Sequence, residues 1–283
     1  MPEAVWGDSI QVNSLKSTDQ IQNKNSDQDV DKWHFKLQPY ALIPVSIYGN
    51  STVKDRTLNY SLGLGSFLDV LRVAALGNVE VWHNNLGFIV SANYVSLNGG
   101  GIKGSHSPLN GTLNSSLTFS QGIYDFALSY HLGAPAMYSL PEKPSNKSFP
   151  QFWFEPIAGV RMNSLNVSID STLNLGLIDA SFQKAVSAGR TEFEPLLGAK
   201  IGIQVADPVT LWVKGTVSGF GTTGTTDSSW SVILAADWWV SRTISLQLGY
   251  AFSQLNYQNA SGSSSFGLKE NLNGPYLSAI FNF

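Results

Sequence analysis

The chain of 283 residues has no cysteine and few charged residues. Without cysteine it can form neither disulfide bonds nor thiolate metal sites. Asp, Glu, Lys and Arg together make up only 13% of the residues, about half the share usual in soluble domains. Groups other than charges must therefore cover much of the surface.

Long hydrophobic runs and a basic surface are also missing. No run of about 18 apolar residues occurs, so a transmembrane helix is excluded. The net charge of −3 provides no basic stripe for phosphates, which argues against a nucleic-acid partner. The sequence does contain 26 Gly, 8 Trp, 10 Tyr and 15 Phe, a composition that suits many turns and aromatic belts. If this chain spans a bilayer, it does so as a closed β-barrel.

Two regions differ in composition. Residues 7–31 are rich in Asp, Asn, Gln, Ser and Lys, with too few large apolar groups to offset the entropy of ordering. We therefore predict a flexible polar arm over residues 1–31 and a β-barrel over 32–283. A short strand at 4–12 stays open as an alternative.

The segment from Trp230 to Val240 alternates most clearly. Its even-numbered positions are all apolar: Trp230, Val232, Leu234, Ala236, Trp238 and Val240. Trp230 and Trp238 would lie on the order of 20 Å apart along a barrel axis, close to the height of an outer-membrane apolar band. Segments 210–218 and 244–253 repeat an apolar face opposite a small or polar one. This pattern indicates lipid outside and a narrow hydrated or packed lumen inside.

The whole pattern predicts an all-β transmembrane antiparallel up-and-down barrel of about ten strands, with the C-terminal strand closing on the first. Tight turns at 84–85, 207–208 and 241–242 should be periplasmic, and long polar loops at 98–112, 171–189, 221–229 and 258–267 should be external. The expected strands are 33–48, 72–83, 86–98, 113–131, 151–169, 190–205, 208–220, 229–240, 243–257 and 268–283.

Two segments fit this scheme less well, and a third between strands predicts a helical turn. The connection 132–150 is long and Pro-rich for a periplasmic turn, and 53–63 alternates well enough to be another strand. If 53–63 joins the barrel, an even number of strands requires one more, such as 4–12, and the count becomes twelve. The segment 66–71 predicts a helical turn capped by Ser66, which could fold over or into the lumen or simply connect two strands.

An internal repeat relates Phe154–Met162 to Phe193–Ile201. In each copy an acid, a Gly and a base share one strand face: Glu155, Gly159 and Arg161 in the first, and Glu194, Gly198 and Lys200 in the second. A base on the lipid face costs about 2 to 4 kcal/mol at mid-depth, so these charges should point inward.

The predicted lumen therefore holds almost balanced charge, with four bases against five acids. Two interpretations stay open: a structural salt-bridge network that fills the barrel, or a constriction that solutes cross. The lumen or constriction residues are Glu80, Asp125, Glu155, Arg161, Glu194, Lys200, Lys214 and Asp237, with Lys36 as the fourth base. The predicted membrane-interface aromatics are Trp230, Trp238, Phe281 and Phe283.

Catalytic and metal motifs have little support. The only adjacent Ser and His, His106 and Ser107, lie in a predicted loop with no recognisable orienting acid. His34, His83 and His131 are isolated near predicted strand ends, so no metal motif is formed. We expect no enzymatic activity, no cofactor and no metal.

The last ten residues, Gly274 to Phe283, form an alternating apolar strand that ends on an aromatic residue. This ending resembles the C-terminal signal by which outer-membrane β-barrels are recognised for insertion. Phe281 and Phe283 fill its two final aromatic positions, and Ser278 stands where Gly is usual. The resemblance implies the barrel-assembly machinery as a partner of the C-terminal strand.

Short motifs in a fixed order extend the resemblance over about residues 33–283. They are Trp33 through Pro39-Tyr40, Phe154-Glu155-Pro156 through Arg161, Glu194-Pro195 through Gly198, Gly219-Phe220-Gly221, Gly249-Tyr250 and Gly274-Pro275 with Phe283. The chain thereby resembles a family of small Gram-negative outer-membrane β-barrels of OmpA- or OmpW-like architecture. Most members lack an established substrate, so the resemblance implies fold and outer-membrane location. Lys200 replaces the usual Arg of the second repeat, losing a bidentate donor.

Three hypotheses for function follow. The first is a non-enzymatic, narrow porin-like channel that passes small solutes across the bacterial outer membrane, in contact with its lipid. The second is a closed structural or adhesive barrel with a salt-bridged lumen and external loops that bind a partner. The third is a soluble, lipocalin-like lipid binder.

Overall fold

The computed structural model describes residues 33–53, 56–105, 111–134, 148–175, 180–222, 226–259 and 266–283. The predicted arm 1–31 and the alternative strand 4–12 lie outside these residues, as do His106 and Ser107. In the described part of the chain, no helix is long and apolar enough to cross a membrane.

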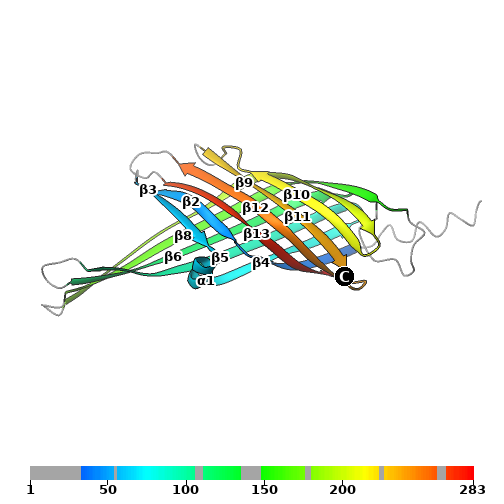
Figure 1. Ribbon diagram of the computed structural model, residues 1–283. Coiled ribbons are helices and arrows are strands. Elements are labelled where there is room, and N and C mark those ends of the chain that lie inside the picture. The colour runs from blue at the N-terminus through cyan, green and yellow to red at the C-terminus, as the bar shows by residue number, and fades with distance from the viewer. Residues whose placement is uncertain are drawn as a thin grey trace, which may run out of the picture.

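Ten antiparallel strands form a closed ring, as the sequence predicts (Figure 1). Each strand pairs with the next along the ring, and β13 pairs with β1 to close it. The ring consists of β1 (Trp33–Leu42), β4 (Leu71–His83), β5 (Leu86–Ser105), β6 (Gly111–Tyr130), β8 (Gln151–Leu175), β9 (Ala180–Ala206), β10 (Val209–Ser218), β11 (Thr226–Trp239), β12 (Ile244–Asn259) and β13 (Phe266–Asn282).

Three further strands lie outside the ring. The hairpin of β2 (Ser46–Val53) and β3 (Arg56–Gly63) pairs through β2 with the first half of β13. The short β7 (Leu132–Gly133) pairs with β8. The alternative of twelve ring strands is therefore wrong: segment 53–63 does contribute the strand β3, but it pairs with β2 outside the ring.

Strand parity follows the sequence prediction. On β11, Trp230, Leu234 and Trp238 are exposed, while Ala235 between them is buried. On β13, Leu277 and Phe283 are exposed, whereas Ser278 and Ile280 are buried. The exterior is thus an apolar belt of Leu, Val, Phe and Trp, which suits hydrocarbon and does not suit a soluble lipocalin-like barrel.

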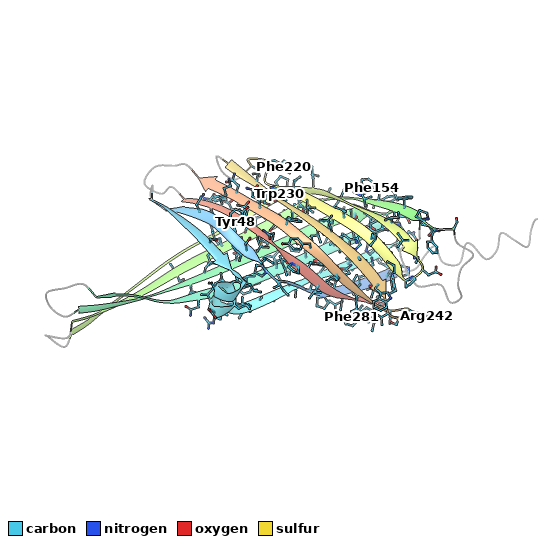
Figure 2. The ribbon with its side chains drawn as sticks, in the orientation of Figure 1. Tyr48, Phe154, Phe220, Trp230, Arg242 and Phe281 are labelled. Carbon is cyan, nitrogen blue, oxygen red and sulfur yellow. The ribbon has the colours of Figure 1, made fainter. Side chains whose placement is uncertain are left out.

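The belt has a recognisable extent along the barrel. Tyr48, Phe220 and Trp230 lie toward one end, and Phe281 and Arg242 lie at the other, where the tight turns are (Figure 2). Between these levels the strands present alternating outward side chains, such as Leu246 and Leu248 of β12. This is the arrangement of a barrel wall that crosses a bilayer.

Four strands continue well beyond that belt. Segments 98–112 and 171–189, expected to be loops, are mostly strand: β5 continues to Ser105, β8 to Leu175, and β9 begins at Ala180. Because these segments lie outside hydrocarbon, a polar composition without apolar alternation does not prevent pairing. β5, β6, β8 and β9 thus form a long sheet that projects from the barrel (Figure 1).

A break between β1 and β2 depends on one glycine. Ile43 N donates to the carbonyl oxygen of Pro275 at 3.0 Å, and Val45 N donates to that of Asn273 at 2.9 Å. A Cβ on Gly274, between those two partners, would overlap the backbone of Ile43. A glycine at 274 is therefore required for the close approach of the first and last strands.

One helix is present, where a helical turn is predicted. α1 (Leu64–Val70) follows β3 and precedes β4. Its N-cap is Gly63, which makes no side-chain capping bond, so the expected Ser66 cap is wrong. The helix begins two residues earlier than expected, because β3 already ends at Gly63. Phe67 is buried, whereas Leu64 and Leu68 are exposed, and the helix lies beside the wall at β4 and β5 (Figure 1).

Candidate functional site in the barrel lumen

The inner face of the barrel carries two charged clusters at different depths. The outer cluster centres on Arg161 of β8. Its Nε donates to Asp125 Oδ1 at 2.7 Å, and its Nη2 donates to Asp125 Oδ2 at 2.9 Å. These two bonds form a bidentate pair between neighbouring strands, with both residues buried.

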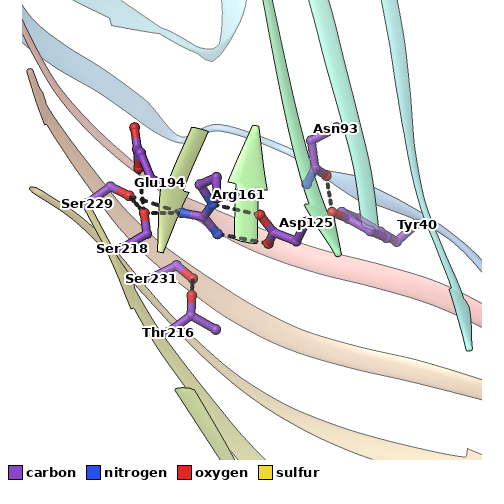
Figure 3. Close-up of polar contacts among 9 residues, drawn as sticks. All are labelled: Tyr40, Asn93, Asp125, Arg161, Glu194, Thr216, Ser218, Ser229 and Ser231. Atoms are coloured by element: carbon purple, nitrogen blue, oxygen red, sulfur yellow. Dashed lines mark hydrogen bonds and ion pairs between the residues drawn. The ribbon is translucent and has the colours of Figure 1, made fainter. Parts of the chain in front are cut away.

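Serine hydroxyls on β10 and β11 extend this cluster to Glu194 of β9, the strand on the other side of β8. Arg161 Nη1 donates to Ser229 Oγ at 3.0 Å, and Ser218 Oγ donates to Glu194 Oε2 at 2.8 Å (Figure 3). The hydroxyls of Ser218 and Ser229 lie 2.6 Å apart and share a hydrogen bond. Glu194, only 1% exposed, is therefore held by a polar network that crosses five strands.

The inner cluster centres on Lys200 of β9. Its Nζ lies 4.5 Å from the ring centroid of Trp212 and 5.1 Å from that of Trp153. Both distances fall within the range of cation–π attraction. Trp212 Nε1 also donates to Asp237 Oδ1 at 2.6 Å, so an acid lies at the edge of the same indole.

Local sequence explains how Trp153 reaches this position. Its indole covers Gly202, the residue that pairs with it on β9, and a Cβ on Gly202 would overlap the ring. Trp153 also lies near His131, with ring centroids 5.8 Å apart. The glycine thus provides the space in which the aromatic wall around Lys200 packs.

Other inner charges make hydrogen bonds or ion pairs near this cluster. His131 Nδ1 and Glu155 Oε1 lie 2.9 Å apart, both buried. Lys36 Nζ lies 3.4 Å from Glu80 Oε2, which also accepts a bond of 2.8 Å from Trp82 Nε1. Three carboxylates, Glu80, Glu155 and Asp237, therefore face three lysines, Lys36, Lys200 and Lys214, at this level.

These side chains leave little open space. Glu80, Glu155, Lys200 and Lys214 line a cavity of about 30 Å³, together with Gln38, Trp212 and Tyr276. A single water occupies about 10 to 15 Å³ on this measure, so the cavity holds about two or three waters at most. Gln38 Nε2 closes the cavity further, donating to Gln247 Oε1 at 2.6 Å and to Tyr276 Oη at 2.7 Å.

The structure thus places all eight predicted lumen residues on the inner face, but in two groups. Asp125, Arg161 and Glu194 form the outer group, and Glu80, Glu155, Lys200, Lys214 and Asp237 belong to the inner group. Lys200 and Glu155 are cross-strand partners, yet the contacts of Lys200 are with two indole rings. The repeat therefore does not build two equivalent sites.

Sequence reasoning missed several partners in these clusters. His131 was expected to be isolated, and it contacts Glu155. Trp153 and Trp212 were not assigned to the lumen, although Trp212 shares strand parity with Lys214, a predicted lumen base. Ser218 and Ser229 carry no signal that separates them from other small inward-facing residues. No group of His, Asp and Glu within the described ranges could hold a metal ion.

A third polar cluster lies beyond the outer group. Tyr257 Oη donates to Glu192 Oε1 at 3.0 Å, and the guanidinium of Arg190 lies 5.0 Å from the Tyr257 ring centroid. Arg190 Nε also pairs with Glu192. These contacts join β9 to β12, and Asn163, Leu165, Leu255 and Leu268 line the same recess.

Comparison with known proteins supports the barrel fold. No protein-family model and no curated protein matches the sequence. Among solved structures, the outer membrane protease OmpT from Escherichia coli aligns with a TM-score of 0.50 at 9% identity, covering 88% of this chain and 97% of OmpT. The fold is that of an outer-membrane β-barrel.

Two other outer-membrane barrels align at lower similarity. The toluene transporter TodX of Pseudomonas putida has a TM-score of 0.31 at 10% identity, covering 89% of this chain and 90% of TodX. The attachment invasion locus protein Ail of Yersinia pestis has a TM-score of 0.31 at 7% identity, covering 89% of this chain and 99% of Ail. At these values the likeness concerns the barrel architecture and carries no argument about activity.

Proposed function

We propose that this protein is a non-enzymatic outer-membrane β-barrel whose lumen is closed at mid-depth by its own charged and aromatic side chains. The functional surface then lies at the outer end, where β5, β6, β8 and β9 project beyond the apolar belt. The barrel anchors that sheet in the lipid and presents it to a partner outside the cell. This corresponds to the closed structural or adhesive barrel among the hypotheses from sequence.

The observation that carries the proposal is the small cavity between Glu155, Lys200 and Tyr276. At about 30 Å³ it is too small for a hydrated ion or a sugar. Glu80, Glu155 and Asp237 are hydrogen-bonded and Lys200 is stacked on two indole rings, and buried contacts of this kind are costly to separate. A solute path would require several of these contacts to open together.

Conductance in planar bilayers tests this proposal. The wild-type protein should show no conductance above that of the bare bilayer. Glu155→Ala and Lys200→Ala should each produce channels, because each removes part of the inner cluster and leaves a void along the axis. Leu277→Ala, on the lipid-facing side of β13, is the matched control and should stay silent.

Two results would overturn the closed barrel. Steady conductance of the wild-type protein would show an open path at rest. Silence of both inner variants, with the folded protein inserted as judged by its heat-modifiable migration in gels, would show that the inner cluster does not close the lumen.

A narrow channel for small solutes is the second candidate function. It is favoured by the continuous polar face inside the belt, which includes Thr216 and Ser218 of β10 and Gln247 and Ser278 near the closing seam. Such a face is expected along a water-filled path. Stable wild-type conductance with ion selectivity altered by Lys200→Ala would support this candidate over the closed barrel.

A further inference from the structure

The wall of the barrel splits above one residue pair. β1 and β4 are paired from Trp33 and His83 as far as Pro39 and Gly77. Proline has no N–H to donate, so a ladder ends readily at such a residue. Beyond Gly77, β4 continues to pair with β5 as far as Leu71, while its pairing with β1 has stopped.

Two unpaired edges diverge from that point. Within the described residues, β3 pairs only with β2, and the Asn98–Ser105 part of β5 pairs only with β6. A wedge therefore opens between β3 and β5. α1 lies at its narrow end, where Figure 1 shows the β2–β3 hairpin on one side and β5 on the other.

Strand register shows that α1 is an insertion that creates the wedge. Lys36 pairs with Glu80, and Ser46 pairs with Gly63. From Lys36 to Ser46, β1 and β2 advance by ten positions. Over the same height, the chain from Gly63 through α1 to Glu80 advances by seventeen, an excess of seven. Seven is the length of α1. Without the helix, β3 and β4 would form one continuous strand in register with both β1 and β2.

The narrow end of the wedge lies within the apolar belt, and its wider part, between β3 and Asn98–Ser105 of β5, extends beyond it. Through β13, the break between β1 and β2 at the narrow end corresponds to Gln247 to Phe252 of β12, a stretch whose outward side chains are lipid-facing. The surroundings of the wedge are apolar on the outside as well: Val45, Leu64, Leu68 and Val73 are all exposed. The outer half of the belt therefore borders the opening.

The lumen side of the wedge is open too. Alternate residues of β4 face opposite sides, yet Arg72, Val73, Ala74 and Ala75 are all exposed. Unpaired backbone N–H and C=O groups are not stable against hydrocarbon, so the strand edges must be met by water from the outer lumen. Water and acyl chains thus meet at this opening, which is the environment that an amphiphile prefers.

We propose that the wedge between β3 and β5 is a lateral portal through which a single-chain amphiphile reaches the outer lumen from the membrane. The apolar chain lies against Leu64 and Leu68, and the polar head enters the lumen above the closed inner cluster. Arg72, exposed at the wedge, offers a cation to an anionic head. This goes beyond the proposed anchoring function and does not depend on it.

Binding of 11-(dansylamino)undecanoic acid to the full chain in lipid nanodiscs tests the portal. We expect saturable fluorescence enhancement above that of empty nanodiscs. Deleting residues 64–70 should join β3 to β4 in register, close the wedge and weaken binding at least tenfold. Absence of saturable binding to the wild-type protein, or equal binding to the folded deletion variant, would overturn the proposal.

A pair of labelled variants decides the matter if the deletion variant does not fold. Leu68, at the portal, is 55% exposed, and Leu128, on the belt at β6, is 54% exposed. Because the chain has no cysteine, Leu68→Cys and Leu128→Cys can each carry one bulky maleimide. The label at 68 should weaken binding at least tenfold and the label at 128 should leave it unchanged. Equal effects of the two labels would overturn the portal.

This test is separate from that of the closed lumen. The probe binds from the bilayer and needs no passage along the barrel axis, so dansyl fluorescence and conductance report different parts of the molecule. A portal that fails leaves the conductance of the Glu155→Ala and Lys200→Ala variants unaffected.

Discussion

Arg161 of β8 and Asp125 of β6 form a bidentate ion pair inside the barrel, through bonds of 2.7 and 2.9 Å. The pair matters because both side chains are buried and neither charge has bulk water as an alternative partner. A guanidinium suits this position, since its planar fork matches a carboxylate and leaves Nη1 free for Ser229.

Replacing the guanidinium of Arg161 by the ammonium group of a lysine should therefore destabilise the barrel. Arg161→Lys keeps the charge but loses at least one charge-assisted hydrogen bond, which should lower the free energy of unfolding by about 2 to 3 kcal/mol. Urea unfolding of vesicle-inserted protein measures the change. Arg242→Lys, in the exposed turn after β11, is the control and should have little effect. Equal stability of Arg161→Lys and wild-type protein would contradict the role of the bidentate geometry.

Glycine at position 202 should be required by the indole of Trp153. Gly202→Ala places a methyl group in the volume of that ring, and overpacking of this kind costs about 1 to 3 kcal/mol. Gly215→Ala on the neighbouring β10 is the matched control, because a Cβ there meets nothing within 4 Å. Unfolding free energies of the two variants provide the comparison. If both lose the same stability, strand propensity rather than the indole contact governs position 202.

The lipid-facing belt predicts a strong position dependence for a new charge. Leu248 of β12 is 62% exposed in the middle of the belt, so Leu248→Arg should lower the unfolding free energy in bilayers by about 2 to 4 kcal/mol. Ser187 of β9 is also exposed but lies on the part of β9 that projects beyond the belt, so Ser187→Arg should cost less than about 1 kcal/mol. Comparable losses at both sites would place the hydrocarbon boundary elsewhere.

Much of this fold could be predicted because period-2 alternation and lipid contact constrain each other. Outward Trp230 and Trp238 fix the parity of β11, and pairing then transmits that parity to its neighbours. Inward Glu155 and Arg161 follow from the cost of a charge in lipid. These inferences need only local sequence and one boundary condition, the bilayer.

The rest depends on contacts that no local pattern encodes. The extent of β8 and β9 beyond the belt was missed because pairing in water needs no apolar face. The partners of Lys200 were missed because Trp153 and Trp212 come from different strands, and parity gives the face of a side chain but not which residues on other strands lie at the same depth. The split of the wall at Pro39 and Gly77 required the register of four strands, which sequence does not give.

The inner cluster allows a test of charge balance itself. Lys200→Met removes one of three lysines that face three buried carboxylates, and an uncompensated buried charge should cost about 3 to 5 kcal/mol of unfolding free energy. Adding Glu155→Gln, at the cross-strand partner of Lys200, removes one acid and restores the balance. The double variant should therefore be more stable than the sum of the two single changes predicts, by about 1 to 3 kcal/mol.

A second double variant provides the control for that coupling. Asp125 belongs to the outer cluster, on β6, and shares no contact with Lys200, so Lys200→Met and Asp125→Asn should be additive within about 0.5 kcal/mol. The full double-mutant cycles would be measured by urea unfolding in the same vesicles. Equal coupling of Lys200 to Glu155 and to Asp125 would show that the lumen responds to total charge rather than to two separate clusters. Coupling confined to Glu155 would establish the inner cluster as a unit, which is what a closed lumen at that depth requires.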